Sequence, residues 1–141
     1  ICWDQWFPEA ARCLALMGAE LLLYPTAIGS EPVLNCDSME HWQRCMQGHS
    51  AANILPVAAA NRVGTETVKP CAENGNQKSS LTFYGSSFIT DSTGAIVESM
   101  GRREEGFIGK GFDLDEIRDM RMEWGLFRDR RPEMYGIISG N

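Results

Sequence analysis

The sequence predicts an α/β fold, because helical and strand patterns alternate along the chain. Apolar residues recur at helical spacing from Pro8 to Met17 and again from Ser38 to Asn53. A short apolar run typical of a buried strand follows each helix, Glu20–Pro25 after the first and Ile54–Ala60 after the second. Helix and strand in this order indicate an α/β unit.

Cys2 stands in a turn-forming run that leads into the first helix. Pro8 suits the first helical position because its missing N–H leaves no donor unbonded, and Glu9 adds favourable negative charge to the first turn. Gly18 ends the helix. A thiol just ahead of a helix feels the positive end of its dipole, which favours the nucleophilic thiolate. Cys2 is therefore a candidate nucleophile, and the alternative is a small buried hydrophobic residue.

The second helix follows a loop over Thr26–Pro32. Asp37 followed by Glu40 resembles a capping box that opens this helix. One face of the helix is apolar, which indicates core packing, with a subunit interface as the alternative. The residues of that face are Met39, Trp42, Cys45, Met46, His49 and Ala52.

The second half of the chain is expected to hold three more strands and a helix. A polar stretch over Thr65–Ser80 is predicted as a surface loop. The expected strands are Leu81–Thr90 and Ala95–Met100, paired around the turn Asp91–Gly94, and a weaker one over Gly106–Phe112.

The last helix is expected to be capped by Asp113 and to end at Gly125. Its apolar face consists of Ile117, Met120 and Trp124. In the tail that follows, Arg128, Arg130 and Arg131 are interrupted by acidic residues, so we interpret the tail as salt-bridged rather than as a phosphate site.

The composition predicts one soluble domain. The 141 residues include 19 Asp and Glu against 13 Lys and Arg, a net charge of −6. This acidic balance argues against a nucleic-acid partner and is compatible with a cationic substrate. The sequence holds no long apolar run and no signal peptide, so we expect no membrane association and a cytoplasmic location.

The five cysteines do not form a recognisable framework. Their number is odd and no pair has Cys-x-x-Cys spacing, which disfavours disulfides and a zinc site and favours reduced, intracellular thiols. His41 and His49 lie eight residues apart without a matching carboxylate pattern, so we interpret them as structural. We therefore expect no metal and no cofactor.

The segment Ile-Cys-Trp-Asp-Gln-Trp-Phe-Pro-Glu-Ala-Ala-Arg at residues 1–12 resembles the nucleophile segment of the nitrilase, or carbon–nitrogen hydrolase, superfamily. The resemblance covers nearly the whole of residues 1–141 and corresponds to the C-terminal part of the family's domain. It implies a nitrilase-type α-β-β-α sandwich, here a partial domain, assembled as a homo-oligomer. Further matching segments are Tyr24–Pro32, Met46–His49, Asn61–Gly64, Phe83–Phe88 and Arg128–Pro132.

The resemblance also implies a reaction. Cys2 is expected to attack the carbamoyl carbon of a small N-carbamoyl amine, while the backbone N–H of Trp3 and a family lysine hold the oxyanion. A family glutamate acts as general base. Because that lysine and glutamate lie upstream of the cysteine in the family, we expect residues 1–141 alone to be inactive. The expected reaction converts N-carbamoylputrescine to putrescine, carbon dioxide and ammonia in cytoplasmic polyamine synthesis.

Substrate selection is expected to involve the loop after the first strand. The resemblance places a substrate-amine contact at Glu31 and includes Ala27 among the substrate-binding residues. Glu31 could pair with a distal ammonium, and the alternative is a solvated loop carboxylate. Trp6 stands where many relatives have arginine, and its indole either faces a cation or fills the core. Asn61 is expected to support the pocket rather than to react.

Three other functions stay open. Another amidase of the superfamily, such as a β-ureidopropionase or a nitrilase, is the nearest enzyme alternative. A catalytically inactive interaction module could use the second helix and the tail. A thiol redox protein would need a resolving cysteine, and none stands near Cys2 in the sequence.

Overall fold

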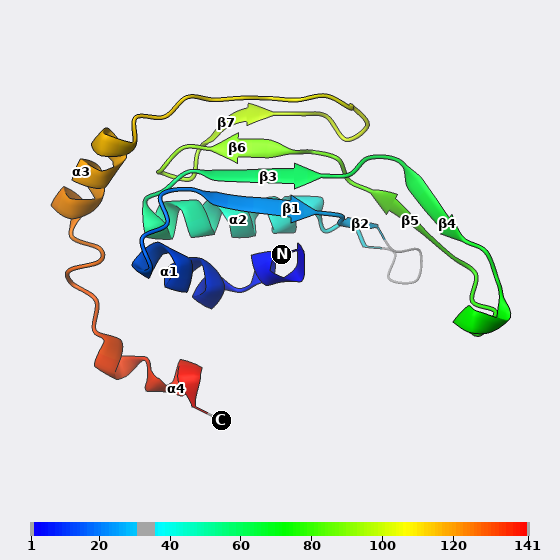
Figure 1. Cartoon of the computed structure of the whole chain (residues 1–141), viewed down its shortest axis with the longest axis horizontal. Coiled ribbons are helices and arrows are strands. Elements are labelled where there is room, and N and C mark those ends of the chain that lie inside the picture. The colour runs from blue at the N-terminus through cyan, green and yellow to red at the C-terminus, as the bar shows by residue number, and fades with distance from the viewer. Residues whose placement is uncertain (1, 31–35, 141) are drawn as a thin grey trace.

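The computed structural model describes residues 2–30 and 36–140, in which helices pack on one face of a four-stranded sheet (Figure 1). The strand order in this sheet is β1-β3-β6-β7. Its strands are β1 (Leu22–Thr26), β3 (Val57–Asn61), β6 (Phe88–Thr90) and β7 (Ile96–Ser99).

The expected α/β unit is confirmed in β1, β3 and the helix between them. The helix α2 (Met39–Asn53) carries the chain from β1 to β3, and the two strands are parallel. Leu22 is paired with Val57 and Thr26 with Asn61, so both strands end at the same edge of the sheet. In open α/β sheets, ligands bind outside this carboxyl edge.

The predicted N-terminal helix is confirmed as α1 (Pro8–Leu16), with Pro8 in its first turn. A 3₁₀ turn, η1 (Cys2–Trp6), precedes it. The turn contacts β1, α1 and α2, so the N-terminal segment is held by three elements.

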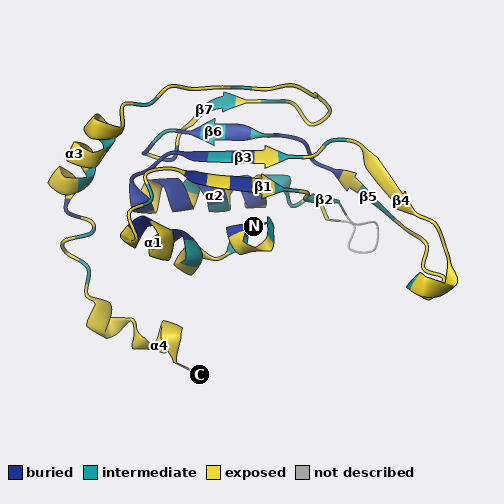
Figure 2. Cartoon of the chain, viewed as in Figure 1, coloured by how far each residue is buried: buried dark blue, intermediate teal, exposed yellow. Residues whose placement is uncertain are grey.

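The core lies between the sheet and the two helices, where Figure 2 shows buried residues on α2 and the facing strands. Along β1, Leu22 and Tyr24 are buried while Leu23 and Pro25 are exposed, because successive side chains of a strand point to opposite faces. The apolar face of α2 packs into this core, and Trp42 on that face is fully buried. Other members of the core are Ala11, Ala15, Met46, Leu55, Val57, Ala59 and Phe88.

The prediction of one strand over Leu81–Thr90 and a loop over Thr65–Ser80 is wrong. The chain forms β5 (Ser79–Phe83) and then β6, which belong to different sheets. The smaller sheet has the order β2-β5-β4, and its other strands are β2 (Gly29–Ser30) and β4 (Thr65–Val68). The polar residues of β4 are all exposed, which explains why their pattern resembles a loop.

The expected pairing of Ala95–Met100 with the preceding strand is confirmed by β6 and β7, which are antiparallel. The predicted strand over Gly106–Phe112 is wrong, since this segment has no ladder partner in the described part of the chain. Gly106, Gly109 and Gly111 weaken strand formation there.

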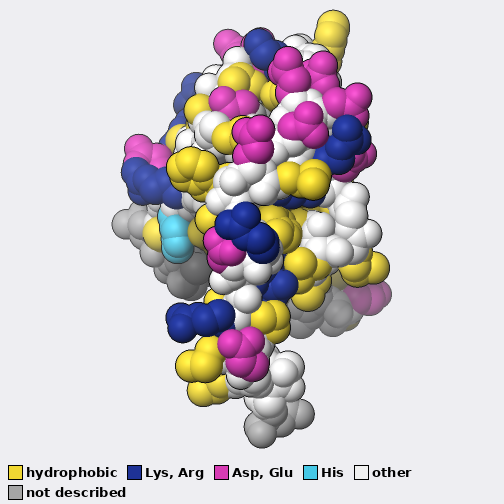
Figure 3. Space-filling model, turned by 90° about the vertical axis from the view of Figure 1, so that its left-hand side faces the viewer, with side chains coloured by type: hydrophobic (Ala, Val, Ile, Leu, Met, Phe, Trp, Pro, Cys, Tyr) yellow, Lys and Arg dark blue, Asp and Glu magenta, His cyan; other side chains and the backbone are white. Residues whose placement is uncertain are grey.

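The last helix is confirmed as α3 (Leu114–Trp124), with Asp113 Oδ1 accepting from the backbone N–H groups of Asp115 and Glu116. Its apolar face is not buried, and Trp124 is 69% exposed. The tail forms two short turns, η3 (Pro132–Met134) and α4 (Gly136–Ser139). Acidic and basic side chains are interspersed over this side of the molecule (Figure 3).

No helix within residues 2–30 and 36–140 combines the length and the apolar character needed to cross a bilayer. The finding agrees with the absence of a long apolar run in the sequence.

Candidate active site

Cys2 lies beside the carboxyl edge of the sheet. Its Sγ is 3.4 Å from the Oγ1 of Thr26, the last residue of β1. Cys2 is half-buried and has a φ of +45°, a left-handed conformation that is disfavoured for residues with a side chain. Strained residues of this kind concentrate at functional sites, so the geometry is compatible with the predicted nucleophile.

Gln5 fastens the turn that carries Cys2, and the sequence interpretation missed this role. Its side chain is 1% exposed, accepts from the Trp42 indole at 2.7 Å and donates to Thr26 Oγ1 at 2.9 Å. Its backbone oxygen lies 2.8 Å from Nε2 of His49. Because two α2 residues hold Gln5, the position of the turn is set by the core.

The segment that follows β1 is held by Asn61, and the expected support of a substrate pocket by this residue stays a prediction. Asn61 Oδ1 accepts from the N–H of Ile28 at 2.9 Å, and its Nδ2 donates to the carbonyl oxygens of Ile28 and Gly85, each at 3.0 Å. Ala27, which precedes Ile28, is exposed beside this anchored backbone. Its predicted contact with substrate stays a prediction.

The two tryptophans of the turn have different surroundings. Trp3 is 70% exposed, and its ring centroid lies 6.3 Å from that of Trp6. Trp6 packs edge-on against His41 at 5.0 Å, and its buried Nε1 has no hydrogen-bond partner among the described residues. Neither the oxyanion role of the Trp3 N–H nor the cation role of Trp6 is tested by these contacts.

A groove of about 810 Å³ runs between α1, α2 and the tail. Trp6 lines it together with Arg12, His49 and Tyr135, but Cys2 is not among the described residues that line it. The structure therefore brings Cys2, Gln5 and Thr26 together, and Trp6, from the same turn, also lines the groove.

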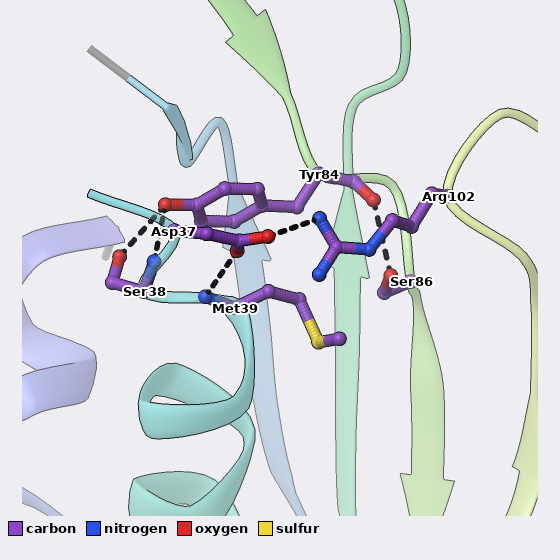
Figure 4. Close-up of polar contacts among 6 residues, drawn as sticks. All are labelled: Asp37, Ser38, Met39, Tyr84, Ser86 and Arg102. Carbon is purple, nitrogen blue, oxygen red and sulfur yellow. Dashed lines mark hydrogen bonds and ion pairs between the residues drawn. The ribbon is translucent and has the colours of Figure 1, made fainter. Parts of the chain in front are cut away.

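Glu31, the predicted ammonium contact, lies outside the described residues. Tyr84, in the turn between β5 and β6, contacts the chain both before and after that segment. Before it, the N–H of Tyr84 donates to the carbonyl of Ile28 at 3.1 Å. On the other side, the Tyr84 hydroxyl lies 2.8 Å from both the N and the Oγ of Ser38 (Figure 4).

The predicted capping box at the start of α2 is replaced by a different arrangement. Asp37 Oδ1 accepts from the N–H of Met39 at 3.1 Å, and Asp37 Oδ2 pairs with Arg102 at 2.7 Å (Figure 4). Glu40 instead pairs with Arg44. The hydrogen-bonded ion pair with Arg102, which is the main cause, and the N–H of Met39 hold the pKa of Asp37 below its usual range.

Two titratable groups near the core are kept neutral by burial. Desolvation raises the pKa of Tyr24 to about 12 and also raises the pKa of the Cys45 thiol. Cys45 is thus a poor competitor for the role of nucleophile. Within residues 2–30 and 36–140, no three His, Cys, Asp or Glu side chains gather in a group that could hold a metal ion.

Comparisons with known proteins place the chain among enzymes that act on carbon–nitrogen bonds. The family described as carbon-nitrogen hydrolase matches residues 1–122. The chain is 55% identical over 139 residues to an N-carbamoylputrescine amidase of Oryza sativa subsp. japonica, covering 98% of this chain and 45% of the relative. It is 57% identical to a citrullinase of Francisella tularensis, covering 98% and 46%. The chain therefore spans under half the length of these relatives.

Solved structures confirm the fold class. A carbon–nitrogen hydrolase from Helicobacter pylori G27 superposes with a TM-score of 0.79 at 35% identity, covering 99% of this chain and 47% of that one. A variant of an amidase from Nesterenkonia sp. AN1 superposes with a TM-score of 0.59 at 25% identity, covering 87% and 40%. In that variant, the acetamide moiety of fluoroacetamide is bound covalently to the active-site cysteine.

Proposed function

Because this chain belongs to the carbon–nitrogen hydrolase superfamily, we propose that the polypeptide carrying it hydrolyses N-carbamoylputrescine to putrescine, carbon dioxide and ammonia. The observation that carries the proposal is the Cys2 sulfur, held 3.4 Å from Thr26 at the carboxyl edge of the sheet. A half-buried thiol fixed to a rigid scaffold is suited to covalent acyl transfer.

The proposed chemistry has two steps. The Cys2 thiolate attacks the carbamoyl carbon, and a carbon–sulfur bond forms while one carbon–nitrogen bond breaks and the departing nitrogen takes a proton. Water then cleaves the carbon–sulfur bond, and the remaining fragment separates into carbon dioxide and the second nitrogen product. The Trp3 N–H and the family lysine stabilise the oxyanion, and the family glutamate moves the protons.

The first test is ammonia release by the full-length polypeptide that carries this sequence. Cys2→Ala should lower the release from N-carbamoylputrescine by about a thousandfold or more, because the nucleophile is removed. Cys13→Ala, at an exposed position of α1, is the matched control and should be unaffected. Ammonia release that persists in Cys2→Ala would overturn the proposal.

A second candidate substrate is citrulline, because the Francisella relative at 57% identity is named a citrullinase. N-carbamoylputrescine and citrulline both carry a carbamoyl amine at one end and an ammonium at the other, but only citrulline carries a carboxylate beside that ammonium, which a carboxylate at position 31 would repel. We propose that Glu31 pairs with the distal ammonium and, with Ala27 and Trp6, selects the diamine derivative.

The substitution Glu31→Gln distinguishes these substrates. We expect it to raise the KM for N-carbamoylputrescine about tenfold, a typical effect of losing a charge-assisted hydrogen bond, and to shift the preference toward citrulline, because a neutral amide no longer repels the citrulline carboxylate. Glu123→Gln, at an exposed position of α3, is the control. An unaltered preference between the two substrates would remove Glu31 from the proposal and leave the role of Cys2 standing.

We also propose that the whole polypeptide is a cytoplasmic homo-oligomer. The groove between α1, α2 and the tail and the exposed apolar face of α3 support association. Analytical ultracentrifugation of the full-length polypeptide tests the assembly, and a monomer at micromolar concentration would contradict it.

A further inference from the structure

Four side chains form a continuous line of contacts that ends on the sulfur of Cys2. Trp42 contacts Gln5, Gln5 contacts Thr26, and Thr26 Oγ1 lies 3.4 Å from Cys2 Sγ. Trp42 and Gln5 are fully buried, and Thr26 is half-buried. Which group donates and which accepts in each of these hydrogen bonds decides whether the Thr26 hydroxyl can donate to the sulfur.

The indole of Trp42 fixes the orientation of the Gln5 amide. An indole nitrogen only donates, so the atom of Gln5 that faces it at 2.7 Å must be the carbonyl oxygen. Turning the amide over would set its NH₂ against the indole N–H, leaving two buried donors unsatisfied. The NH₂ group of Gln5 therefore faces Thr26.

The Gln5 amide in turn fixes the role of the Thr26 hydroxyl. Gln5 Nε2 donates to Thr26 Oγ1 at 2.9 Å, so this oxygen acts as an acceptor toward Gln5. Its own hydrogen stays available for another partner, and Cys2 Sγ is within reach. A thiolate sulfur carries no hydrogen and can only accept, so donation from Thr26 matches the reactive form of Cys2.

We propose that Thr26 donates a hydrogen bond to the Cys2 sulfur, which stabilises and aims the thiolate, and that Gln5 and Trp42 are positioning residues for this donor. The inference rests on the proposed function only in assigning Cys2 as the nucleophile. Hydrogen bonding to the ionised form of a group favours that form. His49 Nε2, which lies 2.8 Å from the backbone oxygen of Gln5, adds a further contact that holds the turn.

The test compares two substitutions of Thr26 in the full-length polypeptide. Thr26→Val keeps the shape and removes the hydroxyl, whereas Thr26→Ser keeps the hydroxyl. At neutral pH, the second-order rate of Cys2 alkylation by iodoacetamide should fall about tenfold in Thr26→Val and stay within about twofold of wild type in Thr26→Ser. The thiolate absorbance in the ultraviolet should fall in parallel.

The control is Thr67→Val, at an exposed position of β4, which should leave the alkylation rate unchanged. With N-carbamoylputrescine, Thr26→Val should lower kcat about tenfold and leave KM within about twofold, because the hydroxyl faces the sulfur rather than the substrate amine. A Thr26→Val enzyme that alkylates at the wild-type rate, or a Thr26→Ser enzyme as slow as Thr26→Val, would overturn the inference.

A second variant decides the matter if Thr26→Val does not fold. In Gln5→Glu, the carboxylate can still accept from Trp42 but has no hydrogen for Thr26, so Thr26 donates to it and turns away from the sulfur. Alkylation should again slow about tenfold, and an unchanged rate would contradict the inference. Alkylation needs no substrate, so wild-type protein that releases no ammonia would refute the proposed function and leave this test intact.

Discussion

The Tyr84 hydroxyl shows how one residue can hold two elements together. Tyr84 is 3% exposed, and its hydroxyl contacts both the backbone N and the side chain of Ser38 at the start of α2. The backbone of Tyr84 also belongs to the turn that anchors Ile28. Tyr84 thus connects the segment after β1, through its backbone N–H, with the helix that follows, through its hydroxyl.

Tyr84→Phe should destabilise the protein without changing its fold. It leaves the half-buried N–H of Ser38 without its partner, which costs about 1–2 kcal/mol of unfolding free energy. Urea denaturation followed by circular dichroism measures the loss. Tyr135→Phe, in the exposed tail, is the control and should stay within about 0.5 kcal/mol of wild type. Equal stabilities of the two variants would contradict the role of the hydroxyl.

The ion pair of Asp37 with Arg102 predicts a dependence of stability on pH. Folding lowers the pKa of Asp37, so the stabilisation is present above the unfolded-state pKa and is lost as pH falls through the lower, folded-state value. Both side chains are about half-exposed, so the contribution is under about 1 kcal/mol.

Asp37→Asn tests this dependence. The difference in unfolding free energy between wild type and variant should be positive at neutral pH, shrink toward zero in strong acid and also shrink at high salt. Unfolding curves at several pH values measure it. A difference that is constant with pH would show that the carboxylate charge has no part in stability.

The polar side chains around Cys2 could not be predicted from the hydrophobic periodicity of the sequence. The nucleophile segment is recognisable from its residue order, but Gln5 is buried in a turn, where no hydrophobic pattern marks it. Thr26 reads as the start of a loop and is the last residue of β1. Gln5 contacts Thr26, 21 residues away, and Trp42, 37 residues away, so only the folded chain brings these side chains together.

At the scale of elements, the change of direction between β5 and β6 is the main departure from the sequence prediction. Apolar residues continue through Leu81–Thr90, which favours one strand. Gly85 and Ser86 have φ values of +57° and +54°, which break the strand. The N–H of Ser86 then donates to the carbonyl of Gly101 at 3.2 Å. Glycine is required at position 85 because a Cβ there would lie 2.5 Å from the backbone oxygen of Arg102.

Gly85→Ala should therefore lower the free energy of unfolding by more than the backbone strain of a positive φ alone would. Gly18→Ala is a matched control, because Gly18 also has positive φ, +99°, but an added Cβ would meet no atom within 4 Å. We expect a loss of about 1 kcal/mol for Gly18→Ala and about 2–4 kcal/mol for Gly85→Ala, where steric overlap adds to the strain. Urea denaturation of both variants measures the difference, and equal losses would contradict the close approach of Arg102.

The start of a helix could be predicted from the sequence where the capping contacts are local. It was predicted wrongly where the carboxylate also binds a residue far along the chain. Asp113 caps α3 through N–H groups two and three residues away, as its sequence spacing predicts. At the start of α2 the N-cap is Ser38, one residue after Asp37, and Asp37 accepts from the Met39 N–H with one oxygen and pairs with Arg102 through the other. Arg102 lies 65 residues further along the chain, beyond the reach of a spacing rule.

At the scale of the whole molecule, the alternation of helix and strand predicted the β1–α2–β3 unit and its parallel pairing. It did not predict the division into two sheets, since strand patterns do not identify which strands are neighbours. The position of the tail was not predicted either, because Phe127 contacts Arg12 of the distant helix α1 as well as Arg121 of the preceding helix. Arg12 and Arg121 lie over its ring, at 4.7 and 5.3 Å from the centroid.

The two arginines connect the tail to the C-terminal end of α2. Arg12 donates to the carbonyl of Ala52 at 2.7 Å and Arg121 to that of Ile54 at 3.2 Å, so both cations also satisfy carbonyl groups at the end of α2. Desolvation by burial lowers the pKa of both arginines. The Phe127 ring contacts both guanidinium groups.

Phe127→Ala should release the tail from the helices. The loss of two cation–π contacts and of apolar burial should cost about 1–3 kcal/mol and expose the chain near Arg128 and Arg130 to trypsin. We expect cleavage there to accelerate about tenfold or more under native conditions, measured by mass spectrometry of timed digests. Phe107→Ala is the control, because Phe107 is 94% exposed and should leave the digest unchanged. If the two variants are cut at the same rate, Phe127 does not anchor the tail.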